Sequence, residues 1–328
     1  MKTRQLGANG FDVSEVGLGC WQLGADWGSG VSREIGMEIL TTAASHGVSF
    51  FDTADVYGAG RSEDLIGQFL KHHDGPPIRV ATKFGRGPDV YPDGYTEEAL
   101  RRGVEASRER LGVEALDLVQ LHCIPTEVMR DGSIFDWLRR LQDEGAIRHF
   151  GASVETVEEG LICLAEEGLQ SLQVIFNLFR QKLVTELFPQ AQQKGVGIIV
   201  RLPLASGMLS GKFTPQTTFA ADDHRNYNRD GAAFNVGETF AGLPFETGLA
   251  LVEELKGMLP EGMTLAKMAQ RWILDHPAVS TIIPGASAPD QIVRNTGVTD
   301  FAPLPAELHE ALAAFYQAEV KDKIRGPY

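Results

Sequence analysis

SFFDTAD, at residues 49–55, is an apolar run that ends in two carboxylates, those of Asp52 and Asp55. RVATKF, at residues 79–84, is a similar run, and its next-to-last residue is Lys83, which carries an amine. Strands that are buried on both faces of a parallel sheet have apolar runs of this kind. In α/β proteins, binding sites lie at the carboxyl ends of the parallel strands. The two stretches therefore predict neighbouring strands that bring acids and an amine to one edge of a sheet.

A third stretch of the same kind, LDLVQLH at residues 116–122, ends in His122. Taken singly, Asp52 and Lys83 could form a buried structural ion pair, and His122 could be a histidine packed in the core. Their coincidence favours a site, because a packed core has no reason to place these three groups at the same level of neighbouring strands. Tyr57 follows the first of these strands, so we expect it close to them.

Short β-rich runs followed by amphipathic stretches recur along most of the chain, which predicts βα units with a parallel sheet. The predicted strands cover residues 15–21, 47–52, 78–84, 116–122, 147–153, 172–177, 196–203 and 279–284, and the predicted helices include residues 97–110, 134–144, 155–166 and 265–275. This number of strands favours a closed TIM-type (β/α)8 barrel, with residues 1–328 as one domain. A doubly wound open sheet shows the same alternation and is the alternative, but no G-x-G-x-x-G lies between a predicted strand and helix.

Two segments break the alternation. Residues 4–13 contain an Asn-Gly step that is typical of a hairpin turn, and we expect this hairpin to cap one end of the barrel. Residues 213–243 follow the seventh predicted strand and are rich in Asp, Arg, Asn, Thr and Gly. Because an ordinary connection is much shorter, this stretch is functional, disordered or both, and we interpret it as a lid over the strand ends.

Composition and charge exclude several classes of function. The net charge of −14, from 44 acidic against 30 basic residues, would repel a polyanion, so nucleic acid is not an expected partner. Three cysteines without a CxxC spacing indicate neither a disulfide framework nor a metal site, and no metal is predicted. The sequence has no apolar signal segment and no membrane-spanning run, so we expect a cytoplasmic globular protein. No pattern in it indicates an oligomeric state.

The residue types at the strand ends suit proton transfer. A tyrosine has an ordinary pKa of about 10 and is a poor acid near neutrality unless a cation stabilises its phenolate. Lys83 is predicted to supply that cation for Tyr57, and Asp52 is predicted to keep the lysine charged and oriented. His122 is predicted to donate a hydrogen bond to a substrate carbonyl or to help relay its proton.

Several motifs agree, in order, with one known family over nearly the whole chain. FDTADVYGAGRSEDLIG at residues 51–67 resembles the signature of the aldo-keto reductase family, VATKFG at residues 80–85 its lysine motif, and DLVQLHC at residues 117–123 its histidine motif. The resemblance assigns the aspartate, tyrosine, lysine and histidine discussed above as a catalytic tetrad. It also implies a TIM-type barrel, a nicotinamide cofactor bound without a Rossmann domain, and reduction of an aldehyde or ketone with Tyr57 as proton donor.

The resemblance further implies where the cofactor lies. The implied cofactor-binding residues are Cys20, Trp21, Asp52, Ser153, Gln173, Arg201, Pro203, Leu204, Lys212, Gly285, Ser287, Gln291 and Asn295. Ser153 and Gln173 would hold the carboxamide, and Arg201 stands where relatives carry a ring-stacking aromatic residue. Backbone groups around Leu204, together with Lys212, would bind the pyrophosphate. Aromatic residues in GLGCWQLGADWG, at residues 17–28, would line the substrate cleft.

IIPGASAPDQIVRN, at residues 282–295, resembles the adenosine-binding segment of the family. An ordinary strand-to-helix turn capped by Ser287 is the structural alternative. Ala286 stands where many NADPH-specific relatives carry a basic residue, and Arg294 and Arg225 are the candidates to replace it. The resemblance favours NADPH as the cofactor, and NADH is the alternative.

The expected function is thus the NAD(P)H-dependent reduction of a small carbonyl substrate to an alcohol. The same site can run in the other direction, so a dehydrogenase of a sugar or a pyridoxine-like alcohol is the first alternative. Some relatives with an intact tetrad mainly serve as partners of membrane channels. A regulatory nucleotide-binding subunit is therefore a further alternative from a different class.

Overall fold

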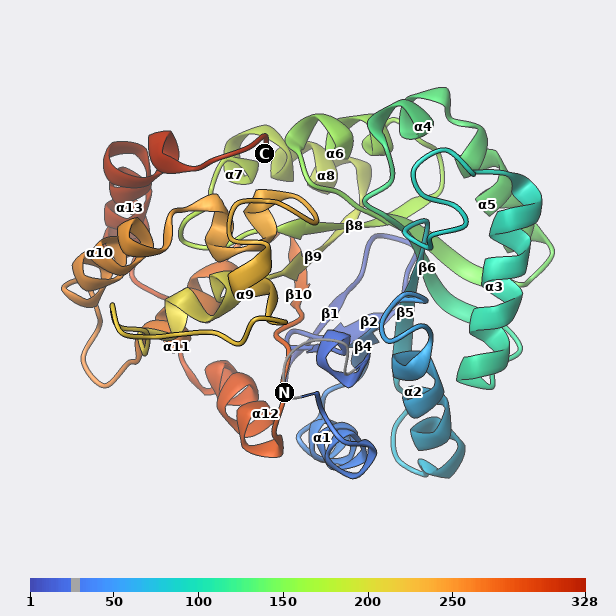
Figure 1. The fold of residues 1–328 in the computed structure, drawn as a ribbon, viewed down its shortest axis with the longest axis horizontal. Helices are drawn as coiled ribbons and strands as arrows, with labels where there is room; N and C mark the ends of the chain where they lie inside the picture. Colours follow the sequence, from blue (N-terminus) through green and yellow to red (C-terminus); the bar gives the residue numbers. More distant parts are fainter. Residues whose placement is uncertain (25–29) are drawn as a thin grey trace.

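A barrel of parallel strands forms the centre of the protein (Figure 1). The computed structural model describes residues 1–24 and 30–328. The barrel strands are β3 (Leu18–Gly19), β4 (Phe50–Asp52), β5 (Arg79–Phe84), β6 (Leu116–His122), β7 (Ile147–Ser153), β8 (Leu169–Ile175), β9 (Gly197–Arg201) and β10 (Val279–Ile282). Each strand pairs with the next, and parallel bridges from Val16 to Ile282 and from Gly19 to Gly285 join β3 to β10. The predicted TIM-type barrel is confirmed.

Helices surround the barrel (Figure 1). The α-helices are α1 (Arg33–Ser45), α2 (Arg61–His72), α3 (Glu97–Leu111), α4 (Thr126–Asp131), α5 (Ser133–Asp143), α6 (Val157–Leu164), α7 (Leu183–Glu186), α8 (Phe188–Lys194), α9 (His224–Tyr227), α10 (Phe245–Lys256), α11 (Leu265–Leu274), α12 (Pro289–Thr296) and α13 (Ala306–Phe315). Contacts run from α1 to α2, from α2 to α3 and from α3 to α5, and α12 packs on α1. Within the described chain, no helix is both long and apolar enough to cross a membrane.

Alternation along the strands separates an outer core from an inner one. The side chain of Phe51 belongs to the large core between the strands and the helices. Phe50 and Leu118 belong to a small core inside the barrel. Because neighbouring side chains of a strand point to opposite faces, Asp52 and Gln120, each two residues further along, also face inward. The same periodicity that builds the core therefore turns polar groups into the barrel at its carboxyl end.

The predicted hairpin closes the opposite end of the barrel. Strands β1 (Thr3–Gln5) and β2 (Asp12–Ser14) pair in antiparallel fashion. Leu6 and Val13, which flank the turn, are buried in the inner core. The hairpin is thus a plug, as its Asn-Gly turn and its position before the first barrel strand predicted.

Element ends differ from the prediction. The first barrel strand is shorter than residues 15–21, because the chain leaves it before Trp21, which begins the 3-10 helix η1 (Trp21–Gly24). The helix predicted from residue 155 begins two residues later, because Thr156 is its N-cap and forms a capping box with Glu159. Hydrophobic periodicity identifies an element but does not fix where its backbone hydrogen bonds stop. Trp27, an aromatic residue of the stretch predicted to line the substrate cleft, lies outside the described residues.

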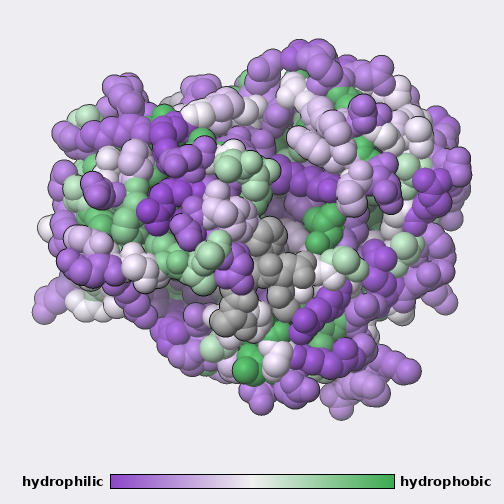
Figure 2. Space-filling view, viewed as in Figure 1, coloured by the Kyte–Doolittle hydropathy of each residue, from purple (hydrophilic) through white to green (hydrophobic). Residues whose placement is uncertain are grey.

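The long segment after β9 is folded. It contains α9 and short 3-10 turns, among them η3 (Val236–Glu238). The rings of Phe213 and Phe240 lie 6.3 Å apart in an aromatic cluster. The buried side chain of Asn228 accepts hydrogen bonds from two backbone N–H groups of the segment, at 2.9 and 3.0 Å. The segment therefore has its own packing and polar framework. Figure 2 shows a mostly hydrophilic surface on this side of the molecule, with hydrophobic residues in small groups.

Candidate active site

Three of the four predicted catalytic residues meet at one amine. Nζ of Lys83 donates hydrogen bonds to Oδ1 of Asp52 at 2.5 Å, to the carbonyl of Thr53 at 2.8 Å and to the hydroxyl of Tyr57 at 3.2 Å. The lysine and the aspartate are almost fully buried, at 1% and 2% exposed. A buried ammonium needs such partners, because burying an unpaired charge is costly. The structure thus brings Tyr57, Lys83 and Asp52 into direct contact, and their predicted catalytic roles stay a prediction.

The second oxygen of Asp52 is held by two glutamines. Nε2 of Gln173 donates to Oδ2 at 2.7 Å, and Nε2 of Gln120 donates to the same atom at 3.0 Å. Both amides are buried. Sequence analysis assigned Gln173 to the cofactor carboxamide and missed Gln120. Strand alternation could have found Gln120, because it lies two residues before His122 on the same face of β6.

A close approach of two backbones fixes the turn that carries Tyr57. Gly58 has φ +63°, and a Cβ there would lie 2.2 Å from the carbonyl oxygen of Gly24. A Cβ on Gly24 would lie 2.7 Å from the backbone nitrogen of Gly58. Any larger residue at either position would push the two segments apart. The hydroxyl of Ser62 ties the same regions together through a 2.9 Å bond to the carbonyl of Cys20.

The protonation of the tyrosine and the lysine follows from their burial and charge. Burial lowers the pKa of Lys83, but Asp52 and then Tyr57 outweigh it and raise the value to about 12. Burial raises the pKa of the Tyr57 phenol above its ordinary value, although the Lys83 ammonium acts in the opposite direction. The net direction for Tyr57 is opposite to the expected acidification. The phenol is a proton reservoir next to a cation, rather than a group that is already acidic.

His122 lies beside the tyrosine and is uncharged near neutrality. The two ring centroids are 5.8 Å apart with the planes at 82°. Burial, followed by the charges of Lys83, Arg86 and Arg201, lowers the pKa of His122 well below its usual value. Its Nδ1 atom is buried and has no hydrogen-bond partner in the described part of the chain. A neutral imidazole in this position can donate one N–H to a carbonyl oxygen.

A second group of charges lies at the same end of the barrel. Arg86 pairs with Glu155 at 2.8 Å and with Glu238 at 3.7 Å. Arg201 pairs with Glu238 at 3.3 Å and also donates to Sγ of Cys123 at 3.6 Å. We call Arg86, Glu155, Arg201 and Glu238 the arginine–glutamate cluster. Sequence analysis expected only Arg201 in the site, and as a residue that stacks on the nicotinamide ring.

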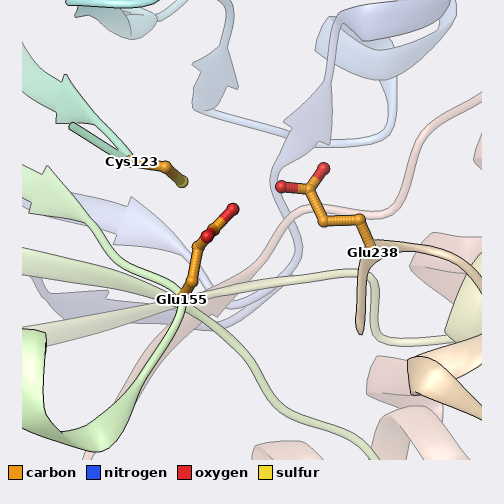
Figure 3. Close-up of side chains that lie close together, drawn as sticks. All are labelled: Cys123, Glu155 and Glu238. Carbon is orange, nitrogen blue, oxygen red and sulfur yellow. The ribbon is translucent and has the colours of Figure 1, made fainter. Parts of the chain in front are cut away.

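The pKa values of the two carboxylates of this cluster shift in opposite directions. Burial and then repulsion from Glu238 raise the pKa of Glu155. For Glu238 burial acts in the same direction, but Arg201 and Arg86 outweigh it and lower its pKa. Glu238 is therefore the anion that neutralises the arginines. Figure 3 shows both carboxylates and the thiol of Cys123 turned toward one space, and their ligand-type atoms lie within 4.8 Å of one another.

The long segment closes over this end of the barrel through two of its residues. Glu238 reaches Arg201 and Arg86, as described above. The ring of His224 packs against that of Trp21, with 4.8 Å between centroids. This arrangement agrees with the lid interpretation of residues 213–243. It also shows Trp21 at the mouth of the barrel, where the sequence predicted it.

The predicted nicotinamide and pyrophosphate positions have different environments. Ser153 is buried, with its hydroxyl 3.5 Å from Sγ of Cys123, and Cys20 and Pro203 are buried as well. Leu204 is half-buried, whereas Lys212 is exposed. Ser153 is the last residue of β7, and the other residues lie after β3 and β9, so all lie toward the carboxyl ends of the strands.

The turn after β9 has an unusual backbone. Leu202, Ala205 and Ser206 have φ values of 53°, 48° and 56°, and Gly207 has 92°. Non-glycine residues rarely adopt positive φ, and such conformations concentrate at functional sites. Successive turns of this kind direct backbone N–H groups into anion-binding concavities. The strain thus lies where the pyrophosphate is expected.

The predicted adenosine segment, residues 282–295, comprises the end of β10, the connection after it and most of α12. Gly285 and Ser287 are exposed, and Gln291 and Asn295 are half-buried. The backbone N–H of Ser287 donates to Oε1 of Gln291 at 2.6 Å. The N-cap of α12 is Ala288 and makes no side-chain cap bond, so the alternative of a turn capped by Ser287 is wrong.

Both basic candidates for a 2′-phosphate carry a partner. Arg294 is exposed and binds Asp290, one turn earlier on α12. Arg225 binds Asp223 at 2.5 Å and lies over the ring of Phe219 at 4.6 Å. A phosphate would therefore compete with a carboxylate for either guanidinium.

Comparison with known proteins shows the family and supports the fold. The model of the Aldo/keto reductase family matches residues 15–317. Probable aldo-keto reductase 1 of Glycine max is 28% identical, over 89% of this chain and 83% of that protein. The glycerol dehydrogenase AKR11B4 of Gluconobacter oxydans has a TM-score of 0.78 and 28% identity, over 99% and 98% of the two chains. The holo form of aldo-keto reductase AKR11C1 of Bacillus halodurans has a TM-score of 0.77 and 27% identity, over 99% and 100%.

Proposed function

Because the chain belongs to the aldo/keto reductase family, we propose that it is an NAD(P)H-dependent oxidoreductase that reduces an aldehyde or ketone to an alcohol. The observation that carries this proposal is the contact of Tyr57 with the Lys83–Asp52 ion pair at the carboxyl end of the strands. The neutral imidazole of His122 packs edge-to-face against the ring of the same tyrosine. A structural ion pair would not need a tyrosine and an imidazole aligned on it.

The residues along the strand ends suit a nicotinamide dinucleotide. Oε1 of Gln22, packed against Gly285, and Nδ1 of His122 are buried without a hydrogen-bond partner among the described residues. Buried polar atoms of this kind are rare in proteins and suit a bound ligand. Ser153 and the amide of Gln173 would hold the carboxamide, and the strained turn after β9 would bind the pyrophosphate. When bound, the reduced nicotinamide supplies a hydride.

The side chains of the tetrad would manage the proton. His122 donates an N–H to the substrate carbonyl oxygen and orients it toward Tyr57. The Tyr57 phenol, kept protonated by its raised pKa, donates its proton to the oxygen as negative charge develops there. Lys83 stabilises the phenolate that remains, and Asp52 holds the ammonium in place. The raised pKa therefore keeps the proton on Tyr57 before the transfer, and the neighbouring cation stabilises the phenolate after it.

NADPH is our proposed cofactor, with NADH as the alternative. Arg294 of α12 is exposed and would be free to bind a 2′-phosphate once it releases Asp290. Replacing it (Arg294→Ala) should raise the KM for NADPH more than the KM for NADH. An equal change in both values would favour NADH or another phosphate-binding group.

A direct assay tests the proposed reaction. Loss of NADPH absorbance would be followed with small aldehydes and with methyl 4-formylbenzoate, an uncharged aromatic aldehyde. Tyr57→Phe should lower kcat by about 10²- to 10⁴-fold while the cofactor still binds, because only the donated proton is lost. Tyr91→Phe, at an exposed tyrosine, is the control. The proposal fails if wild type and Tyr57→Phe bind the cofactor but are equally inactive on every carbonyl.

Oxidation of an alcohol is the second candidate. It is favoured by the similarity to a protein described as a glycerol dehydrogenase. The same four side chains serve this direction, since Tyr57 then accepts the proton that it otherwise donates. Turnover of matched aldehyde and alcohol pairs in both directions would show which reaction the site favours.

A further inference from the structure

We infer that the substrate of the proposed reaction carries a carboxylate, and that Arg86 and Arg201 bind it in the position that the Glu238 carboxylate occupies in the closed protein. The inference rests on the proposed function, because it concerns the substrate of the same site. Three observations carry it: the location of the two arginines, the origin of their counter-charges, and the chemistry of the group that faces them.

Both arginines belong to the barrel and face the reacting end. Arg86 follows β5, three residues after Lys83, and Arg201 is the last residue of β9. Their side chains are 22% and 12% exposed, so neither is a solvated surface group. The guanidinium of Arg201 reaches Sγ of Cys123, the neighbour of His122. Both positive charges also contribute to the lowered pKa of His122.

Among the described residues, the barrel itself supplies one carboxylate for these two guanidinium groups. Glu155 lies in the connection between β7 and α6, and it pairs with Arg86. Glu238 comes from the long segment after β9 and pairs with both arginines. Without Glu238, the described residues of the barrel end would pair two guanidinium groups with the carboxylate of Glu155 alone. Such an excess of buried positive charge attracts an anion of the size of a carboxylate.

The Glu238 carboxylate, which now pairs with the two arginines, indicates the chemical class of the ligand. Arginine presents a planar set of N–H donors that matches a carboxylate, and a carboxylate is what Glu238 now offers it. A metal ion is a poor alternative, although Cys123, Glu155 and Glu238 lie close enough together to be ligands. A cation there would face two guanidinium groups. Burial also raises the pKa of the Cys123 thiol, which disfavours the thiolate that a metal requires.

A matched pair of substrates tests the inference. 4-Carboxybenzaldehyde carries the anion, and methyl 4-formylbenzoate has the same aldehyde without the charge. We expect kcat/KM to favour the acid by about 10- to 100-fold, as one or two charge-assisted hydrogen bonds would give. Arg86→Met should bring the ratio of the two kcat/KM values close to one. Glu238→Gln should raise the ratio, because the competing carboxylate is removed.

A surface arginine provides the control for these variants. Arg102→Met removes an exposed partner of Glu98 on α3 and should leave the substrate ratio unchanged. Comparable kcat/KM values for acid and ester in wild type would overturn the inference. A Glu238→Gln variant that loses activity on both substrates alike would also overturn it, because Glu238 would then only hold the segment closed.

A binding measurement distinguishes failure of this inference from failure of the proposed reaction. Calorimetric titration of the cofactor-loaded Tyr57→Phe variant with each aldehyde measures the preference without turnover. Tighter binding of the acid in a protein whose wild type reduces neither aldehyde would support the anion site and contradict the proposed reaction. Reduction of both aldehydes with equal affinity for them would support the reaction and overturn the anion site.

Discussion

The tetrad and the arginine–glutamate cluster lie at the same end of the barrel but are built in different ways. Asp52, Lys83 and His122 stand on three successive barrel strands, and Tyr57 is held in a tight turn directly after the first of these. The cluster depends on Glu238, which is brought in by the long segment after β9. Strand register therefore fixes one group, whereas the conformation of a connection completes the other.

This difference separates chemistry from recognition. Asp52, Lys83 and His122 are buried, and Asp52 is hydrogen-bonded to Lys83 and to two glutamines, so their geometry changes only if the barrel changes. The cluster is an assembly of paired charges, one of which is supplied by the long segment rather than by the barrel. Barrel enzymes commonly keep catalytic residues on strand ends and vary specificity through loops. Variants that affect one group and spare the other test whether this division holds here.

The largest effect is expected from Lys83→Met. The change leaves the buried Asp52 carboxylate without its cation and Tyr57 without the charge that stabilises a phenolate. We expect kcat to fall by about 10²- to 10⁴-fold and the free energy of unfolding to fall by about 3–5 kcal/mol. Assays of carbonyl reduction and urea unfolding measure the two losses. Lys71→Met, on an exposed position of α2, is the control, and a fully stable Lys83→Met protein would contradict the prediction.

The next effect depends on pH. Burial and then repulsion from Glu63 raise the pKa of Asp55 to about 7, and its Oδ1 atom is buried without a partner in the described chain. Because its pKa is raised in the folded state, the Asp55 carboxyl contributes most to the free energy of unfolding at low pH. This contribution is lost as the pH rises through 7. The Asp55→Asn side chain stays uncharged at every pH and therefore avoids this loss. The free energy of unfolding of the variant relative to wild type should therefore rise by about 2–3 kcal/mol between pH 5 and pH 8.

Urea unfolding at the two pH values measures this growth. Asp64→Asn, at an exposed carboxylate of α2, is the control. An effect of Asp55→Asn that is the same at pH 5 and pH 8 would show that the carboxyl does not titrate between them.

A smaller effect is expected from Gln120→Met. The variant removes one of the two amides that donate to Oδ2 of Asp52, while Gln173 keeps the other bond. We expect a loss of about 1–2 kcal/mol in the free energy of unfolding and a fall in kcat of less than tenfold. Gln190→Met, at an exposed position, is the control. A change in the substrate ratio of acid to ester would contradict the prediction, because the amide does not contact the cluster.

Much of the fold and the tetrad could be predicted from the sequence. The strands of a parallel barrel are buried on both faces and therefore have apolar sequences. A polar residue at the end of such a strand is easy to recognise in the sequence. Asp52, Lys83 and His122 were found in this way. Strand alternation also places Gln120 in the barrel, but an amide carries no charge to draw attention to it. The tyrosine was expected to be acidic, and the structure corrects this because burial outweighs the lysine.

The arginine–glutamate cluster could be predicted only in part. Arg86 and Glu155 follow strands, and their sequence positions hint that they lie at the barrel mouth. Glu238 gave no such indication, because a polar stretch without periodicity does not show which of its side chains returns to the barrel. Its position is set by tertiary contacts, among them the bond from the Ser206 hydroxyl to the Glu238 carbonyl. Such contacts join residues far apart in the chain and have no local sequence pattern.

The smallest effect is expected from Ser206→Ala, which weakens the anchor of Glu238 without touching the tetrad. The Ser206 hydroxyl donates to the carbonyl of Glu238 at 2.8 Å and accepts from the backbone N–H of Phe240 at 3.3 Å. Losing these bonds should lower the local stability of residues 236–240 by about 1 kcal/mol, which corresponds to about fivefold faster amide exchange. Ser210→Ala, in the same turn, is the matched control.

Hydrogen exchange followed by mass spectrometry measures this difference peptide by peptide. Peptides from β4, β5 and β6 should keep their protection in the Ser206→Ala variant, because the tetrad strands do not depend on the segment. Equal loss of protection in the barrel and the segment would mean that the two regions open together. In that case Glu238 would be part of the barrel framework, and the division between a fixed catalytic group and a separable recognition group would not hold.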